Sequence, residues 1–106
     1  MKAKAHARKR YDILVTYDVD TTTKAGEKRL RRVASICEGF GQRVQYSVFE
    51  CRVDEAQLEA LEHRFLETMN KDTDSIRIYL LYGGRDGALR VYGQDHYQDF
   101  DEPLII

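Results

Sequence analysis

The sequence predicts a single α+β domain, and three observations support this fold class. The chain has 106 residues, too few for two domains that each bury a core of their own. Hydrophobic residues make up 42% and charged residues 33%, which is typical of a chain that folds rather than of a disordered one. Segments with the apolar spacing of amphipathic helices alternate with segments of strand character, which favours a small sheet with helices on one face.

The first part of the chain predicts one strand and one helix. Residues 11–17 are rich in β-branched and aromatic side chains and suit a central strand of the sheet. Over residues 24–40 the apolar side chains recur at intervals of three and four, as on one face of a helix, and Gly39 and Gly41 supply the signal that ends it.

The middle of the chain predicts two short strands and a second helix. Residues 43–53 regain strand character but are too long for one strand of a small sheet, so we expect two strands joined by a bend near residues 46–47. Asp54 is a good helix cap, with Gln57 three residues later in a variant of the capping box. The second helix therefore begins after Asp54 and ends near Asn70.

The last third predicts two further strands. Residues 75–82 alternate apolar with polar side chains, and an Asp-Gly turn at residues 86–87 leads to a short fifth strand at 89–92. The order strand, helix, strand, strand, helix, strand is that of a ferredoxin-like βαββαβ sandwich, here with an additional short C-terminal strand.

One face of the sheet needs a cover that the two helices do not provide. Four side chains of the first strand share one apolar face, which we expect to be the uncovered one. These are Tyr11, Ile13, Val15 and Tyr17. A second copy is the simplest cover, so we expect a homodimer packed sheet against sheet. The apolar end after Pro103 would add an edge strand to the partner subunit.

Charge and composition define the remaining expectations. Basic residues gather in residues 1–10, a flexible arm before the domain at 11–93, whereas the tail at 94–106 is acidic, so the net charge of −1 says little about partners. Without a secretory signal or a membrane-spanning run, we expect a cytoplasmic protein with no membrane partner. Cys37 and Cys51 fall within apolar patterns and are expected to be buried thiols.

Three motifs resemble the CRISPR-associated protein 2 family. They are the strand end Tyr17-Asp18-Val19, the run Arg-Val-Gln-Tyr-Ser-Val-Phe-Glu-Cys at residues 43–51, and Asp-Ser-Ile-Arg-Ile-Tyr at residues 74–79. The ending at residues 101–106 also resembles that of members found beside type I CRISPR systems. The resemblance implies a metal-dependent endonuclease that hydrolyses RNA or DNA in CRISPR adaptation and in defence against foreign nucleic acid.

Asp18 is the candidate catalytic residue and metal ligand. It ends a buried strand, where a rigid element presents a side chain to solvent. The resemblance implies that this aspartate binds magnesium, or manganese in its place. One carboxylate holds magnesium poorly, whereas two converging carboxylates suit its octahedral geometry, so Asp18 and its symmetry mate in a dimer would complete the site. The alternative is that Asp18 or Asp20 merely ends the strand and caps the helix, and we assign Asp20 to capping.

Four arginines are candidate phosphate ligands. Arg31 and Arg32 face away from the apolar stripe of the first helix and Arg29 lies at its border, so the helix presents a basic surface. A solvated charged face is the alternative. The resemblance implies a phosphate contact for Arg29, Arg31 and Arg43.

Three further residues enter the site through the resemblance. Ser47 would hydrogen-bond a phosphate or the backbone, while Phe49 and Tyr17 would pack the site. Plain core or dimer packing is the alternative for both aromatic residues, because buried rings contribute mainly through apolar area. The candidate nucleic-acid-binding residues are Tyr17, Arg29, Arg31, Arg32, Arg43, Ser47 and Phe49.

The sequence leaves two functions open. The first is a magnesium-dependent endonuclease, and the second is a non-catalytic dimeric adaptor that holds the CRISPR integrase and protospacer DNA during spacer acquisition. A ferredoxin-like domain that binds a small ligand is a more distant third, since a ligand pocket does not require arginines around an aspartate. Nothing in the sequence brings two histidines together for ribonuclease-style acid and base catalysis.

Overall fold

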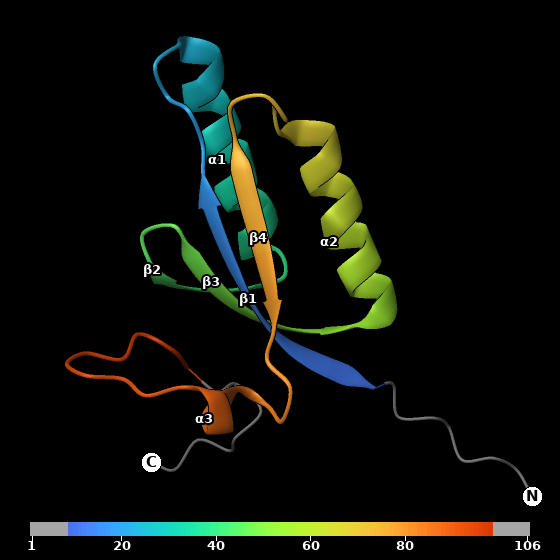
Figure 1. Ribbon diagram of the computed structural model, residues 1–106, viewed down its shortest axis with the longest axis vertical. Helices are drawn as coiled ribbons and strands as arrows, with labels where there is room; N and C mark the ends of the chain where they lie inside the picture. The colour runs from blue at the N-terminus through green and yellow to red at the C-terminus, as the bar shows by residue number, and fades with distance from the viewer. Residues whose placement is uncertain (1–8, 99–106) are drawn as a thin grey trace, which may run out of the picture.

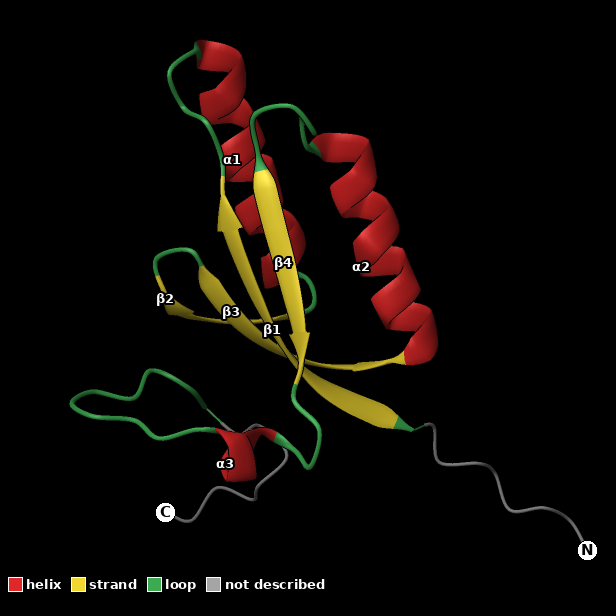
Figure 2. Ribbon diagram, in the orientation of Figure 1, coloured by secondary structure: helices red, strands yellow, loops and turns green. Residues whose placement is uncertain are grey.

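The structure, a computed structural model that describes residues 9–98, is a four-stranded antiparallel sheet with two long helices (Figure 1). The elements are β1 (Arg10–Asp18), α1 (Lys24–Glu38), β2 (Gly41–Gln45), β3 (Val48–Asp54), α2 (Glu55–Thr68), β4 (Ser75–Leu80) and the short α3 (Arg85–Ala88). The strand order in the sheet is β2-β3-β1-β4 (Figure 2). The predicted ferredoxin-like arrangement is therefore confirmed, including the bend between β2 and β3.

Both long helices cover the same face of the sheet. Ile13 and Val15 of β1 are inaccessible to solvent, and they belong to one core with residues of α1 and α2. The helical part of this core comprises Val33, Cys37, Leu61 and Phe65. The prediction that Tyr11, Ile13, Val15 and Tyr17 lie on the uncovered face is wrong, since Tyr17 also belongs to this core and Tyr11 packs against it.

The neighbouring strand explains which face is buried. In register, Val15 lies opposite Phe49 and Leu14 lies opposite Glu50, so the Val15 face is apolar on both strands whereas the Leu14 face is mixed. Because paired residues project to the same side of a sheet, the helices cover the Val15 face. The open face of the sheet therefore carries Leu14 and, two residues further along β1, Thr16.

Local caps begin the two long helices. Thr23 caps α1 by accepting a 3.1 Å hydrogen bond from the Gly26 N–H, while the Asp20 carboxylate accepts from the Thr22 N–H and closes the preceding turn. The assignment of Asp20 as the helix cap is thus wrong. The predicted capping box of Asp54 and Gln57 at the start of α2 is confirmed.

The chain after β4 departs from the prediction. Gly83 and Gly84 have φ values of +87° and +93°, a conformation that turns the chain away from the β4 direction. The Asp-Gly pair at residues 86–87 lies within α3, and residues 89–92 form no strand in the described part of the chain, so the predicted fifth strand is wrong. Within residues 9–98 this segment pairs with no strand of the sheet.

Other expectations concern the ends and the cysteines. β1 begins at Arg10, one residue inside the expected arm; the rest of that arm to residue 8, and the expected edge strand after Pro103, lie outside the described residues. Cys37 and Cys51 are free buried thiols, as predicted, and burial raises the pKa of each to about 12. No helix in residues 9–98 is long and apolar enough to cross a membrane.

Candidate functional site

Asp18 lies at the end of β1, and its carboxylate has no partner within residues 9–98. It is exposed, it pairs in register with Ser75 of β4, and its side chain has no hydrogen bond or ion pair among residues 9–98. Strand alternation places it on the same face as Leu14 and Thr16, the open face of the sheet. A rigid strand therefore presents a free carboxylate on the side that the helices leave uncovered.

The Asp18 carboxylate is the kind of group that could serve as one ligand of a divalent cation. Among the described residues, no group of three or more His, Cys, Asp or Glu side chains could hold a metal ion. Hard cations such as magnesium take oxygen ligands and fill the remaining positions with water and phosphate oxygens. Within residues 9–98, Asp18 would therefore need ligands from elsewhere to complete such a site.

The turn between β2 and β3 lies against the same end of β1. The Tyr17 N–H donates to the Ser47 carbonyl at 3.3 Å, and Thr16 pairs with Val48 at the start of β3. The rings of Tyr17 and Phe49 stack with their centroids 6.2 Å apart. Three of the predicted site residues, Tyr17, Ser47 and Phe49, are thus neighbours.

Arg43 joins this group from β2. Its guanidinium lies 5.1 Å from the centroid of the Phe49 ring and donates a hydrogen bond to the Tyr17 hydroxyl. Burial raises the pKa of that hydroxyl, and Arg43 offsets only part of the effect, so Tyr17 is a protonated phenol at neutral pH. Arg43 itself is exposed and charged, and it is therefore available to an anion.

The cluster of Arg43, Tyr17 and Phe49 lies at the same end of the sheet as Asp18 but on the opposite face. Arg43 lies opposite Phe49 in register and shares its face, the one that the helices cover, whereas Asp18 projects to the open face. No hydrogen bond or ion pair within residues 9–98 connects them. A polynucleotide that passes over this end of β1 would meet both.

Arg29 has a structural partner rather than a free guanidinium. Its Nε donates to Asp74 Oδ2 at 2.9 Å, and the Asp74 side chain is inaccessible to solvent. Asp74 also accepts hydrogen bonds from the N–H groups of Asp20 and Asn70 and from the Thr73 hydroxyl. Asp74 thereby fastens the loop that follows Asp18 to α1 and to the segment that precedes β4.

These donors determine the charge state of Asp74. Burial alone raises the pKa of its carboxyl, but the hydrogen bonds from Arg29 and the surrounding donors outweigh burial and lower the pKa to about 2. Asp74 is consequently ionised across the physiological range, and the ion pair with Arg29 is permanent there.

Arg31 and Arg32 lie on exposed positions of α1, away from this cluster. Arg32 lines a groove between α1 and α2 with Arg64 and Glu67. Within the described residues neither Arg31 nor Arg32 has a hydrogen bond or ion pair. The structure thus leaves both cations free but does not bring them to Asp18.

Sequence reasoning missed two residues of this region, Tyr46 and Asp74. Tyr46 occupies the turn between β2 and β3, is 77% exposed, and has the Arg43 guanidinium 5.8 Å from its ring centroid. An aromatic residue at a turn position was the available signal for Tyr46. Asp74 begins the motif at residues 74–79, but no local signal pairs it with Arg29, which is 45 positions away.

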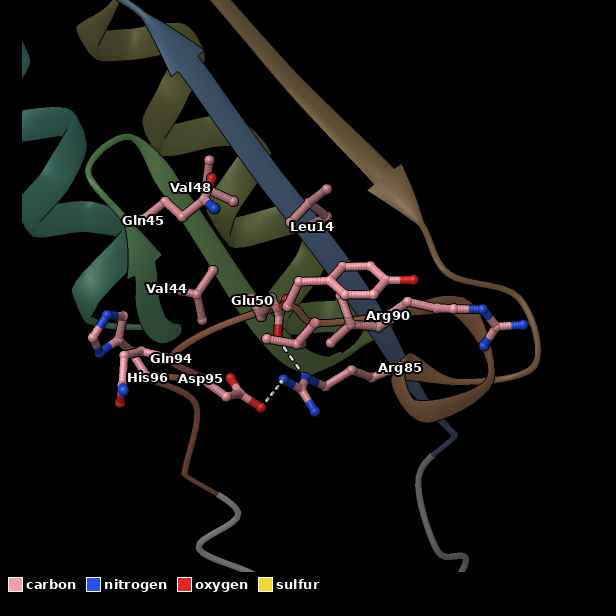
Figure 3. Close-up of a pocket in the computed structure, with 13 residues that line it drawn as sticks. Leu14, Val44, Gln45, Val48, Glu50, Arg85, Arg90, Gln94, Asp95 and His96 are labelled. Atoms are coloured by element: carbon pink, nitrogen blue, oxygen red, sulfur yellow. Dashed lines mark hydrogen bonds and ion pairs between the residues drawn. The ribbon is translucent and has the colours of Figure 1, made fainter.

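A separate cavity of about 400 Å³ lies between the open face of the sheet and the segment after α3 (Figure 3). Arg85 crosses its floor, donating to Glu50 and to Asp95, and its backbone N–H donates to Asp12. The Arg85 guanidinium also lies 3.6 Å from the centroid of the Tyr97 ring. Through its contacts with Glu50, Asp95 and Tyr97, Arg85 joins the segment after α3 to the sheet.

Comparison with known proteins identifies the family. The family model described as CRISPR associated protein Cas2 matches residues 11–87. The CRISPR-associated endoribonuclease Cas2 1 of Moorella thermoacetica is 53% identical over 94 residues, which cover 89% of this chain and 98% of that protein. The CRISPR-associated endonuclease Cas2 of Halalkalibacterium halodurans is 43% identical over 93 residues, covering 88% and 97%.

A solved structure agrees with the sequence comparisons. The crystal structure of Streptococcus pyogenes Cas2 at pH 6.5 superposes with a TM-score of 0.69 at 49% identity, and the match covers 77% of this chain and 99% of that one. The fold, the motifs and the extent of these matches lead to one conclusion: the chain belongs to the CRISPR-associated protein Cas2 family.

Proposed function

We propose that the protein is a metal-dependent endonuclease that hydrolyses phosphodiester bonds of RNA or DNA in CRISPR adaptation and defence. The observation that carries this proposal is the free carboxylate of Asp18, presented by a rigid strand at the sheet end that also carries Arg43. The relatives named endoribonuclease and endonuclease support the same activity.

The cation in this proposal is magnesium, or manganese in its place, held by Asp18 from each of two chains. Held by these residues, the ion would lower the pKa of a water molecule and polarise the phosphodiester. The chain's own contribution is to fix the two carboxylates and to position the polynucleotide. The proposal includes no histidine as acid or base. His63 is paired with Glu67 on α2, and His96 lines the cavity after α3.

A homodimer packed through the open faces of the sheets is the second part of the proposal. Leu14 and Val48 of that face line the cavity under the segment after α3, whereas Tyr79 is 44% exposed, and a second copy would bury it. Asp18 lies on the same face, so this packing brings the two Asp18 side chains toward one interface. The dimer and the metal site are therefore one structural feature.

The roles of the basic and aromatic residues follow from their contacts. Arg43, already fixed by Tyr17 and Phe49, is the principal phosphate ligand, and Ser47 lies beside it in the turn. Arg31 and Arg32 extend the basic surface along α1. Arg29 acts as a positioning residue, because its guanidinium is held by Asp74.

A dimeric adaptor that holds the CRISPR integrase and protospacer DNA is the second candidate function. Its support is the exposure of Tyr82 and Tyr92, at 83% and 86%, in the segment after β4. The proposed cleavage at Asp18 does not involve these large side chains, whereas a protein partner would bury them. The two functions share the nucleic-acid surface and are separated by substitution of Asp18.

Arg43→Ala tests the nucleic-acid surface. We expect binding of labelled RNA and DNA to weaken about tenfold, and the slope of log affinity against log salt concentration to fall by about one, because one phosphate contact is lost. Fluorescence anisotropy between about 50 and 200 mM salt measures both quantities.

Arg64→Ala is the matched control for this measurement. Arg64 is also an exposed arginine over a phenylalanine ring, 5.7 Å from the Phe40 centroid, but it lies on α2. An unchanged salt slope in the Arg43 variant, or an equal loss in the Arg64 variant, would reject Arg43 as a phosphate ligand.

A further inference from the structure

Tyr46 is an aromatic side chain that the fold holds at the surface. β2 ends at Gln45 and β3 begins at Val48, so Tyr46 occupies a two-residue turn. The other turn residue, Ser47, accepts a hydrogen bond from the Tyr17 N–H, which fixes the turn against β1. The ring is nevertheless 77% exposed, and the protein's own core therefore does not explain it.

Arg43 gives this ring a cationic neighbour with a fixed position. Its guanidinium lies near two rings, 5.8 Å from the Tyr46 centroid and 5.1 Å from that of Phe49, and it donates to the Tyr17 hydroxyl. Phe49 is fully buried and Tyr17 is 6% exposed, so these two residues anchor the cation. Tyr46 is the one ring of the three that remains open to a ligand.

A cation beside an open aromatic ring suits a particular part of a polynucleotide. Unpaired bases stack on aromatic side chains, and a neighbouring arginine binds the phosphate that follows. Bases inside a duplex are already stacked on one another and cannot use such a platform unless they are extruded. The pair should thus distinguish an unpaired nucleotide from a paired one.

We propose that Tyr46 and Arg43 form a binding site for one unpaired nucleotide, with the base stacked on Tyr46 and the phosphate on Arg43. This inference rests on the proposed nucleic-acid function and deepens it, since it names the substrate class as a polynucleotide with a single-stranded segment at the end of β1. Sequence preference is not expected, because every base has a face that stacks.

Other exposed tyrosines lack this arrangement. Tyr79 on β4 accepts a hydrogen bond from Arg77 through its hydroxyl, and Tyr82 has no cation over its ring among the described residues. Tyr82 is 83% exposed, close to the exposure of Tyr46, and so it serves as the matched control.

The test compares Tyr46→Ala, Tyr46→Phe and Tyr82→Ala for binding to a labelled single strand and to a blunt duplex of the same length. Tyr46→Ala should weaken single-strand binding about tenfold and change duplex binding less than about twofold, because only the stack is lost. Tyr46→Phe and Tyr82→Ala should bind as the wild type does. The wild type should bind a single strand with one abasic position less tightly than the intact strand. Tyr46→Ala should bind the abasic and the intact strand with the same affinity.

Three results would overturn the inference. The first is an equal loss by Tyr46→Ala on single strand and duplex, and the second is a Tyr46→Phe variant as weak as Tyr46→Ala. The third is a change in the oligomeric mass of Tyr46→Ala by light scattering, which would assign Tyr46 to a protein interface. If Tyr46→Ala is neutral while Arg43→Ala weakens binding, the inference alone fails; if the wild type binds neither probe, the proposed function fails as well.

Discussion

Asp18→Asn is expected to abolish divalent-metal-dependent cleavage, lowering the rate by about a thousandfold or more, since the cation it holds would supply several kcal/mol of transition-state stabilisation. The amide has the shape of the carboxylate but not its charge. Asp18 has no side-chain partner among residues 9–98, so the substitution removes a metal ligand and disturbs no internal contact. The fold, the oligomeric mass and the affinity for nucleic acid should stay as in the wild type.

Cleavage of labelled RNA and DNA with Mg²⁺, with Mn²⁺ and after chelation measures this effect. Glu59→Gln is the matched control, because it makes the same change at an exposed carboxylate on α2. Cleavage that survives unchanged in Asp18→Asn would place the activity at another site or in a contaminating nuclease. Loss of cleavage with integrase binding and spacer capture intact would show that the catalytic and adaptor functions are separable.

Asp74→Asn is expected to lower the free energy of unfolding by about 3 kcal/mol, the usual cost of breaking a buried ion pair from one side. The Asp74 side chain is inaccessible, and four donors depend on it: Arg29, Asp20 N–H, Asn70 N–H and the Thr73 hydroxyl. Chemical denaturation followed by circular dichroism measures the change. Asp72→Asn, two residues away and exposed, should change the unfolding free energy by less than about 0.5 kcal/mol.

The pH dependence of stability provides a second test of Asp74. Its pKa in the fold is about 2, below the ordinary value of 3.8, so the folded state holds this proton more weakly than the unfolded chain does. The stabilisation, about 2 kcal/mol, is therefore complete above pH 4 and is lost as the pH falls toward 2. Asp74→Asn should lack this component of acid denaturation. A variant as stable as the wild type, with the same acid limb, would show that Asp74 contributes nothing to the fold.

Arg29 distinguishes a structural from a ligand role in the same assay. Arg29→Met should destabilise the protein, and combined with Asp74→Asn it should cost less than the sum of the two single changes, because both remove one ion pair. If Arg29 were instead a phosphate ligand, Arg29→Met would weaken nucleic-acid binding by the folded protein and leave its stability unchanged.

The order of elements was predictable, but the orientation of the central strand was not. In β1 an apolar set, Tyr11, Ile13, Val15 and Tyr17, alternates with a set that is polar except for Leu14, and periodicity alone does not say which cover, helices or a second copy, lies over the apolar set. The polar residues Glu50 and Arg52 of β3 decide the matter through the register of β1 with β3. A pairing 35 or more positions apart in the sequence is not visible in the periodicity of either strand.

Two further predictions failed because several residues or structures were compatible with the local sequence. Asp20 and Thr23 both precede α1, and the loop geometry gives the cap to Thr23 because Asp20 is held at its backbone by Asp74. Residues 89–92 have strand composition, yet two glycines of positive φ and the contacts of Arg85 lead the chain across the open face instead. Composition alone does not supply the edge that a strand requires.

Site residues that lie close together in one sequence motif could be predicted to be neighbours. Residues whose role depends on a contact with a distant part of the sequence could not be predicted. Arg43, Ser47 and Phe49 lie within nine residues of sequence, and the hairpin that they form brings them to Tyr17 as expected. The family resemblance implied a phosphate contact for Arg29, which lies at the border of the apolar stripe of its helix. Its actual partner, Asp74, comes from the segment before β4.

Mn²⁺ binding followed by electron paramagnetic resonance tests the shared metal site most directly. Two Asp18 carboxylates that meet across the open faces predict one tightly bound ion per two chains, in protein whose mass by light scattering is that of a dimer. That ion should be absent from Asp18→Asn and present in Glu59→Gln. One ion per chain, or equal binding by Asp18→Asn, would contradict a site shared between two copies.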